Sequence, residues 1–194
     1  MIVISGPSGV GKDAILARMK ELKRPFYHTI TATTRPQRAG ERDGQDYYFL
    51  SEIKFKEMVE RCEFLEWANV YRNWYGVPRH QVEEALSRGQ DVIIKVDVQG
   101  ATTIKGLIPQ AVFIFLTPPS LEGLAQRLRQ RETESSIDVA LRMEKAQEEM
   151  KCLSLFDYAV VNRQDKVDLA VAQIDAIITA EKCRAHPRVV RPDE

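Results

Sequence analysis

A glycine-rich segment near the N-terminus has residue types and a spacing that suit phosphate binding. Its sequence is GPSGVGK, and it follows a short apolar run, Ile2 to Ile4. Glycines let the backbone curl so that successive N–H groups point at one anion, and a helix that starts here adds partial positive charge. The closing lysine supplies an ammonium for terminal phosphates. A glycine-rich turn is the alternative, but strand, loop and helix in register predict a phosphate loop made of Gly6, Pro7, Ser8, Gly9, Val10, Gly11 and Lys12.

The residue after this lysine departs from the usual pattern. A Ser or Thr hydroxyl normally follows and ligates Mg²⁺, whereas this chain has Asp13. A carboxylate is also a hard oxygen ligand, so we hypothesise that Asp13 belongs to a Mg²⁺ site, directly or through water. Repulsion from nearby phosphates opposes this role. The alternative is that Asp13 only places a favourable charge at a helix N-terminus.

A second candidate anion site follows in the segment TTRPQRAGE, residues 33–41. Arg35 and Arg38 lie three positions apart, and Pro36 and Gly40 keep the segment from forming an ordinary helix. Two such guanidinium groups suit bidentate clamping of one phosphate, and Tyr47 can add a neutral donor. Taken alone, the segment is better explained as a solvated arginine-rich loop.

The elements that must position these residues are strands and helices in alternation. Apolar runs at 2–4, 92–96, 112–116 and 158–161 indicate strands, and the central ones are apolar on both faces. Helical patterns begin near Asp13, after Pro119 and near Val167. This alternation predicts a parallel sheet covered by helices on both faces.

One region breaks the alternation. Between about 31 and 78, strand-like segments at 47–50 and 63–70 flank an amphipathic helix, which predicts a small mixed sheet. We therefore expect a core made of residues 1–31 and 81–183, an insertion at 32–80, and a loose tail at 184–194.

Composition excludes several classes of protein. Twenty-eight Lys and Arg balance twenty-eight Asp and Glu, which argues against nucleic acid and against an anionic membrane surface as partners. No apolar run is long enough to span a bilayer, and the N-terminus lacks the features of a signal peptide. Three widely spaced cysteines, Cys62, Cys152 and Cys183, favour neither a disulfide framework nor a zinc site. A cytoplasmic location is expected.

The order of the motifs resembles that of the guanylate kinase family of P-loop nucleoside-monophosphate kinases. The matching pieces extend from about Ile2 to Glu181: GPSGVGK, TTRPQRAGE with DGQDYYF, FLEWA, WYGVP, VDVQGA, FLTPPS, and RLRQR with RMEKAQEEM. The resemblance implies an α/β fold: a three-layer P-loop kinase with a parallel central sheet, a small mixed α+β acceptor-binding insertion and a helical lid. It also implies phosphoryl transfer from ATP to GMP with Mg²⁺, and small-molecule nucleotides as partners.

The resemblance implies roles for residues on the acceptor side. Arg35, Arg38, Tyr47 and Tyr75 would hold the phosphate of GMP. Thr31 and Glu66 would read the guanine edge, because a carboxylate can accept hydrogen bonds from N1–H and the 2-amino group, and adenine offers no such pair. Asp97 matches an acidic position near the base or the metal; the alternative is that it only caps the next turn.

On the donor side the resemblance implies a lid at about 123–150 that carries Arg127, Arg131 and Arg142. Lid arginines stabilise a transferring phosphoryl group, so Lys12, Arg35, Arg131 and Arg142 are the candidate catalytic residues. For Arg127 and Arg142 the alternative is a solvated helix face. Asn162 matches a position near the donor adenine, although the acidic residue that usually follows it is Arg163 here.

Two further departures accompany Asp13. Lys95 stands where the family usually has an acidic residue, and Val77 stands where a small hydroxyl residue usually helps to bind the acceptor. Lys95 can pair with a nearby acid or contact a phosphate, and the sequence does not choose. Asp13 and Val77 also resemble ribose bisphosphate kinases, which leaves another acceptor as an alternative. A non-catalytic interaction module is a second alternative, although such modules usually lose the phosphate loop.

Overall fold

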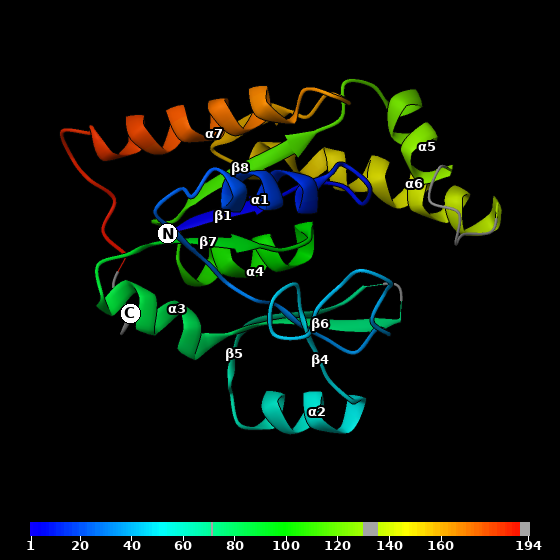
Figure 1. Ribbon diagram of the computed structural model, residues 1–194, viewed down its shortest axis with the longest axis horizontal. Coiled ribbons are helices and arrows are strands. Elements are labelled where there is room, and N and C mark those ends of the chain that lie inside the picture. Colours follow the sequence, from blue (N-terminus) through cyan, green and yellow to red (C-terminus); the bar gives the residue numbers. More distant parts are fainter. Residues whose placement is uncertain (71, 130–135, 191–194) are drawn as a thin grey trace.

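The computed structural model describes residues 1–70, 72–129 and 136–190 (Figure 1). Its larger sheet has five parallel strands in the order β2-β7-β1-β8-β9. Their bounds are Phe26–His28, Asp91–Lys95, Ile2–Ser5, Val112–Thr117 and Tyr158–Val161. The predicted parallel sheet is confirmed. β2 was not expected, because its three residues are only half-buried and carry no apolar run.

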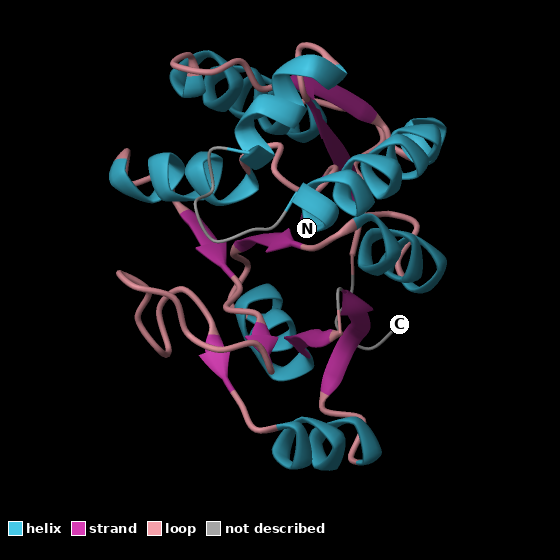
Figure 2. Cartoon of the chain, turned by 90° about the vertical axis from the view of Figure 1, so that its right-hand side faces the viewer, coloured by secondary structure: helices cyan, strands magenta, loops and turns pink. Residues whose placement is uncertain are grey.

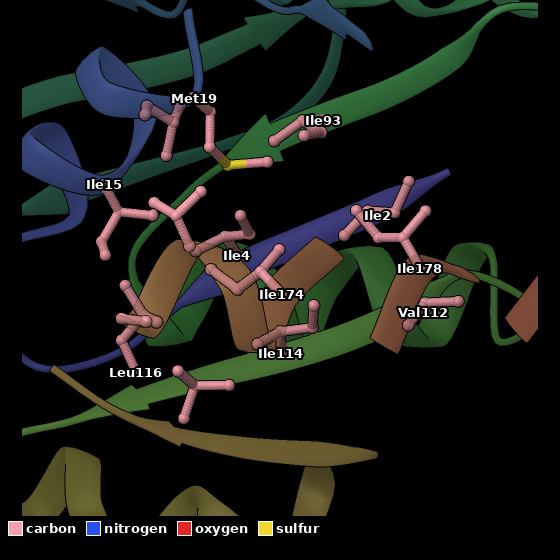
Figure 3. Packing of buried hydrophobic residues seen from close by; sticks show 14 of the residues in the cluster. Ile2, Ile4, Ile15, Met19, Ile93, Val112, Ile114, Leu116, Ile174 and Ile178 are labelled. Atoms are coloured by element: carbon pink, nitrogen blue, oxygen red, sulfur yellow. The ribbon is translucent and has the colours of Figure 1, made fainter. Parts of the chain in front are cut away.

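Helices cover both faces of this sheet and make the three predicted layers. α1 (Lys12–Glu21) and α7 (Val167–Lys182) pack on the face that receives Ile2 and Ile4 (Figure 3). Val3 points to the opposite face, which is covered by α3 (Arg79–Ser87) and α4 (Val98–Leu107). Alternate side chains of one strand thus serve two apolar cores, as expected for a sheet buried on both sides.

A smaller mixed sheet lies to one side of the parallel sheet (Figures 1 and 2). Its order is β4-β3-β6-β5, with β3 parallel to β4 and antiparallel to β6. Phe55 of the adjoining helix stacks on Phe64 at a centroid distance of 4.5 Å. The predicted mixed sheet is confirmed. The strands are Ala32–Thr33, Tyr48–Phe49, Phe64–Val70 and Asn73–Pro78, and the helix is α2 (Glu52–Glu60).

Two helices stand together at one end of the parallel sheet (Figure 1). They are α5 (Leu121–Arg129) and α6 (Ser136–Lys151), and the 3-10 helix η1 (Cys152–Leu155) follows α6. Leu124 and Leu128 of α5 pack against Ala146 of α6. These contacts make a small apolar core outside the two faces of the sheet.

The C-terminal segment differs from the expected loose tail as far as Arg188. The guanidinium of Arg188 donates to Glu181 Oε2 at 3.0 Å, to the Ala111 carbonyl at 3.2 Å and to Asp157 Oδ2 at 3.3 Å. Ala111 and Asp157 are distant from Arg188 in the chain, so the local sequence did not reveal these contacts. Within the described residues, no helix has both the length and the apolar character of a membrane span.

Candidate active site

The phosphate loop connects β1 to α1 at the carboxyl end of a central strand. Gly6, Gly9 and Gly11 have φ angles of 144°, 82° and 98°. A Cβ atom at Gly6 would lie 2.3 Å from the Leu116 carbonyl oxygen, and one at Gly11 would lie 2.5 Å from Asn162 Nδ2. Both the backbone conformation and the close packing therefore require glycine at these positions.

Polar groups of the loop are paired within the protein. Lys12 Nζ donates to the carbonyls of Gly6 and Pro7 at 2.5 and 3.2 Å. Desolvation lowers the pKa of Lys12, while the charges of Glu149, Asp13 and Asp97 oppose that effect. The ammonium is thus held at the mouth of the loop.

Glu149 is the hydrogen-bond partner of Ser8 in the phosphate loop, and the sequence analysis did not identify it. This buried side chain comes from α6, and its Oε2 accepts a hydrogen bond from the Ser8 backbone N–H at 3.2 Å. The carboxylate therefore takes a position at which the loop can bind an anion. Its only sequence signal was membership of the RMEKAQEEM motif, which did not single it out.

Arg127 and Asn162 support the loop from behind. Both side chains donate to the Val10 carbonyl, at 3.1 Å from Arg127 Nη1 and 2.8 Å from Asn162 Nδ2. Arg127 Nη2 also donates to the Asn162 carbonyl at 2.8 Å. Arg127 is thus bonded to the core and does not belong to a merely solvated face.

A cavity beside the loop collects most of the residues expected on the acceptor side. They come from the start of α1, from β5, β6 and β7, from the segment that precedes β4 and from the segments that follow β2 and β7, so the tertiary fold alone brings them together. The lining is Lys12, Asp13, Thr31, Tyr47, Glu66, Ala68, Val70, Tyr75, Lys95, Val96 and Asp97.

Glu66 is the most unusual group in this cavity. Its side chain is buried, and its Oε2 has no hydrogen-bond partner among the described residues. Burial, and then the nearby charge of Asp97, raise the pKa of Glu66 to about 8. A Cβ at Gly100 would approach Oε2 to 2.6 Å, so the glycine leaves room for this carboxyl group. Buried polar atoms are rarely left unpaired, which marks Oε2 as a candidate ligand contact.

A second cavity adjoins the first and brings the arginine pair to the phosphate loop. The lining residues that it shares with the first cavity are Lys12, Asp13, Tyr47, Val70, Tyr75 and Asp97. The residues that only the second cavity has are Ser8, Gly9, Gly11, Arg35, Arg38, Arg142 and Glu149.

Arg35 is fixed within this second cavity. It is buried, and its two terminal nitrogens donate to Glu41 at 2.8 and 2.5 Å. Its guanidinium carbon lies 4.9 Å from the centroid of the Tyr47 ring. Arg38 is exposed, and its backbone N–H also donates to Glu41 at 2.8 Å. A solvated loop therefore does not describe Arg35.

Asp97, Val77 and Arg131 differ in where the structure places them. Asp97 Oδ1 caps α4 through the Gly100 N–H at 2.9 Å, while its Oδ2 is buried without a hydrogen-bond partner among the described residues. Val77 is fully buried with Leu65 in the core and is not part of either cavity lining in the described chain. Arg131 lies outside the described residues.

Two of the departures from the family pattern meet in space. Lys95 Nζ lies 2.6 Å from Asp13 Oδ1 and donates to Tyr47 Oη at 2.8 Å. Of the two roles left open for Lys95, pairing with an acid is the one observed. In the described part of the chain, no group of three or more His, Cys, Asp or Glu side chains is arranged to hold a metal ion by itself.

Comparisons with known proteins agree with this geometry. The family model described as guanylate kinase matches residues 1–181. The chain is 48% identical to the guanylate kinase of Caldanaerobacter subterraneus subsp. tengcongensis, over 95% of this chain and 88% of the relative. It is 44% identical to guanylate kinase 2, chloroplastic/mitochondrial, of Oryza sativa subsp. japonica, over 98% of this chain and 67% of that protein. A crystal structure of guanylate kinase from Anaplasma phagocytophilum superposes with a TM-score of 0.80 at 29% identity, covering 95% of this chain and 87% of the other.

Proposed function

The chain belongs to the guanylate kinase family, and from this membership we propose that it transfers the γ-phosphoryl group of ATP to GMP, giving ADP and GDP. The observation that carries the proposal is the pair of adjoining cavities. They join a complete phosphate loop to a buried carboxyl group with unmet hydrogen-bonding capacity. Both substrates of such a reaction need to meet in one enclosed space.

Glu66 and Thr31 would recognise the guanine base. The carboxylate of Glu66 would accept hydrogen bonds from N1–H and the 2-amino group, which supplies the unpartnered Oε2 with donors. Adenine has no matching pair of donors. A buried carboxylate without partners is unfavourable, so the site would reject AMP.

Arg35, Arg38, Tyr47 and Tyr75 would hold the phosphate of GMP. Their side chains line the cavity that also contains the phosphate loop. Arg35 is already oriented by Glu41, so little side-chain freedom remains to be lost on binding.

The donor would bind at the phosphate loop, with Lys12 released from its carbonyl partners toward the β- and γ-phosphates. Asn162 would lie near the donor adenine and Arg127 would bind the donor from the lid, while both support the loop. Arg35, Arg131 and Arg142 would stabilise charge on the transferring group, whose transition state is loose. Such a transfer needs neither a general base nor a covalent intermediate from the protein.

Mg²⁺ would accompany ATP, since this ion is usually held by substrate phosphates and one or two carboxylates. The buried Oδ2 of Asp97, which has no hydrogen-bond partner in the described structure, fits such a ligand. Asp13 fits less well, because the Lys95 ammonium already engages its carboxylate. When bound, the ion neutralises phosphate charge as the group transfers.

Domain closure would complete the site. We assign the core to residues 1–31 and 81–183, the acceptor-binding insertion to 32–80, the lid to about 123–150 and a tail to 184–194. Closure of the insertion and lid would exclude water and prevent futile hydrolysis of ATP. The balanced charge and free cysteines support a cytoplasmic enzyme that binds nucleotides and neither nucleic acid nor membranes.

An ADP-release assay with GMP, dGMP, AMP, UMP and ribose bisphosphate as acceptors tests the proposal. GMP should support the highest turnover, and AMP, UMP and the sugar phosphate should support little. Glu66→Gln should raise the KM for GMP by about 10- to 100-fold and change the KM for ATP by less than about twofold.

Glu60→Gln, on the exposed face of α2, removes the same charge outside the site and should behave as the wild type. Turnover with ribose bisphosphate and none with GMP would overturn the assignment in favour of the sugar-phosphate kinase. A protein that binds no ATP in a calorimetric titration would instead be an interaction module.

A further inference from the structure

Lys95 joins the phosphate loop to the acceptor-binding insertion through one ammonium group. It ends β7, and its Nζ lies 2.6 Å from Asp13 Oδ1 at the start of α1 and 2.8 Å from Tyr47 Oη. The Lys95 side chain is 14% exposed, whereas that of Asp13 is 65% exposed. Lys95 therefore lies inside the cavity wall, and Asp13 closes the pair from the solvent side.

The ammonium group of Lys95 determines the direction of its hydrogen bond to Tyr47. An ammonium carries three N–H donors and no acceptor, so the Tyr47 oxygen accepts from Lys95. The hydroxyl hydrogen of Tyr47 must then point to another acceptor. Tyr47 lines both cavities, so that hydrogen is available to an anion bound between them.

The Tyr47 ring is also held in place. Lys95 Nζ lies 4.3 Å from its centroid and the Arg35 guanidinium carbon lies 4.9 Å from it. Tyr75 contacts the ring edge-on at a centroid distance of 6.3 Å. The ring is therefore oriented before any ligand binds, which favours tight binding of a small anion.

Asp13 explains why a lysine is tolerated at this position. The Asp13 carboxylate lies 2.6 Å from the Lys95 ammonium and offsets its charge where the lysine side chain is largely buried. An ammonium in this wall without a carboxylate partner would be costly. The two departures from the family pattern therefore compensate each other as one ion pair.

We propose that Lys95 is a positioning residue for the acceptor: anchored by Asp13, it makes the Tyr47 hydroxyl a hydrogen-bond donor toward the phosphate of the acceptor nucleotide. The proposal rests on the proposed function, because it takes GMP as the acceptor. In this proposal Asp13 serves as the ion-pair partner of Lys95. The ion pair links the phosphate loop to Tyr47 in the acceptor site.

A double-mutant cycle on GMP binding tests the proposal. Isothermal titration with GMP alone, without ATP or Mg²⁺, is carried out on the full chain and on Lys95→Met, Tyr47→Phe and the double variant. Each single variant should weaken GMP binding by about tenfold, the size expected for a hydrogen bond to a charged group. The double variant should also lose about tenfold, because both changes remove one interaction.

Three comparisons separate positioning from a general structural role. Lys95→Arg, which keeps the charge and the donors, should restore most of the affinity. Asp13→Asn should weaken GMP binding by less than Lys95→Met does. Lys54→Met, which removes the same charge from the exposed face of α2, should leave GMP binding unchanged.

Additive losses, about 100-fold in the double variant, would overturn the proposal, as would Lys95→Met with unchanged affinity for GMP. Equal losses of ADP and GMP binding in Lys95→Met would assign Lys95 a structural role and also overturn it. Failure of the wild type to bind GMP would contradict the proposed function itself, which is a different result.

Discussion

The phosphate loop and the Glu66 cavity adjoin each other, yet they satisfy their polar groups in opposite ways. In the loop, Lys12 is bonded to two carbonyls and the Ser8 N–H is bonded to Glu149. In the cavity, Glu66 Oε2 and Asp97 Oδ2 are buried with no hydrogen-bond partner among the described residues.

This difference separates affinity from selectivity. A donor at the loop must exchange internal hydrogen bonds for bonds to phosphate, which any nucleoside triphosphate can provide. An acceptor nucleotide in the cavity must supply hydrogen-bond donors to the Glu66 carboxyl group. A base without those donors leaves the carboxyl group unpaired. The loop thus recognises the charge of a phosphate group, and the cavity recognises the hydrogen-bond donors of the base.

The largest predicted effect concerns the loop. Lys12→Met should lower kcat by about 100- to 1,000-fold, because the ammonium stabilises charge on the transferring phosphoryl group. GMP binding measured without ATP should change by less than about threefold. Lys20→Met, which removes an exposed charge from the same helix α1, is the matched control. A comparable loss of GMP affinity in Lys12→Met would show that the two regions do not act separately.

The second prediction concerns pH and the cavity. The pKa of Glu66 is raised to about 8 in the free protein, and the carboxylate is the form that accepts two hydrogen bonds from guanine. GMP binding should therefore release a proton below pH 8, and affinity should rise with pH between 6 and 8 by up to about tenfold per unit. Calorimetry in metal-free buffers of different ionisation enthalpy measures this release. Glu66→Gln should abolish the component due to Glu66 and leave any due to the GMP phosphate.

The same shift affects stability with a definite sign. The folded-state pKa of Glu66 is above its ordinary value of 4.5. Its favourable contribution to the free energy of unfolding is therefore complete below pH 4.5 and is lost as pH rises through about 8. Thermal unfolding without nucleotide should show Glu66→Gln stabilising the protein more at pH 8.5 than at pH 5. An equal effect at both values would refute the raised pKa.

The smallest predicted effect concerns Glu149. Glu149→Gln keeps an oxygen that can accept from the Ser8 N–H but removes a negative charge from the phosphate site. ATP binding without GMP should tighten by about threefold, since repulsion between partly screened charges is modest. GMP binding should remain unchanged. Weaker ATP binding would mean that Glu149 assists the donor and does not merely occupy its place.

Much of the fold followed from local patterns. The central strands β1, β7 and β8 were predicted because continuous apolar runs are characteristic of strands buried on both faces. The edge strand β9 was predicted from a shorter apolar run. β2, β3 and β6 were missed. β2 and β3 are only two or three residues long, and β6 contains Gly76 and Pro78, so none has a periodicity that identifies it.

The site was predicted unevenly for a similar reason. The phosphate loop is continuous in the chain, and its glycines are needed for its own backbone conformation, so it could be identified from seven residues. The role of Gly100 in making room for Glu66 could not be identified from the sequence, because the two residues meet only where β5 packs against α4. Glu149 was not predicted because its partner is the backbone N–H of Ser8, and a contact to a backbone group leaves no characteristic residue type in the sequence.

The sequence by itself determined the phosphate loop, the parallel sheet and the family, because these depend on neighbouring residues and on the order of motifs. Only the tertiary structure decided the environments of the charged groups. It placed Val77 in the core, left Glu66 Oε2 without a hydrogen-bond partner among the described residues and brought Lys95 to Asp13. Pairing, burial and pKa depend on distances between segments far apart in the chain, and those distances exist only once the core has packed.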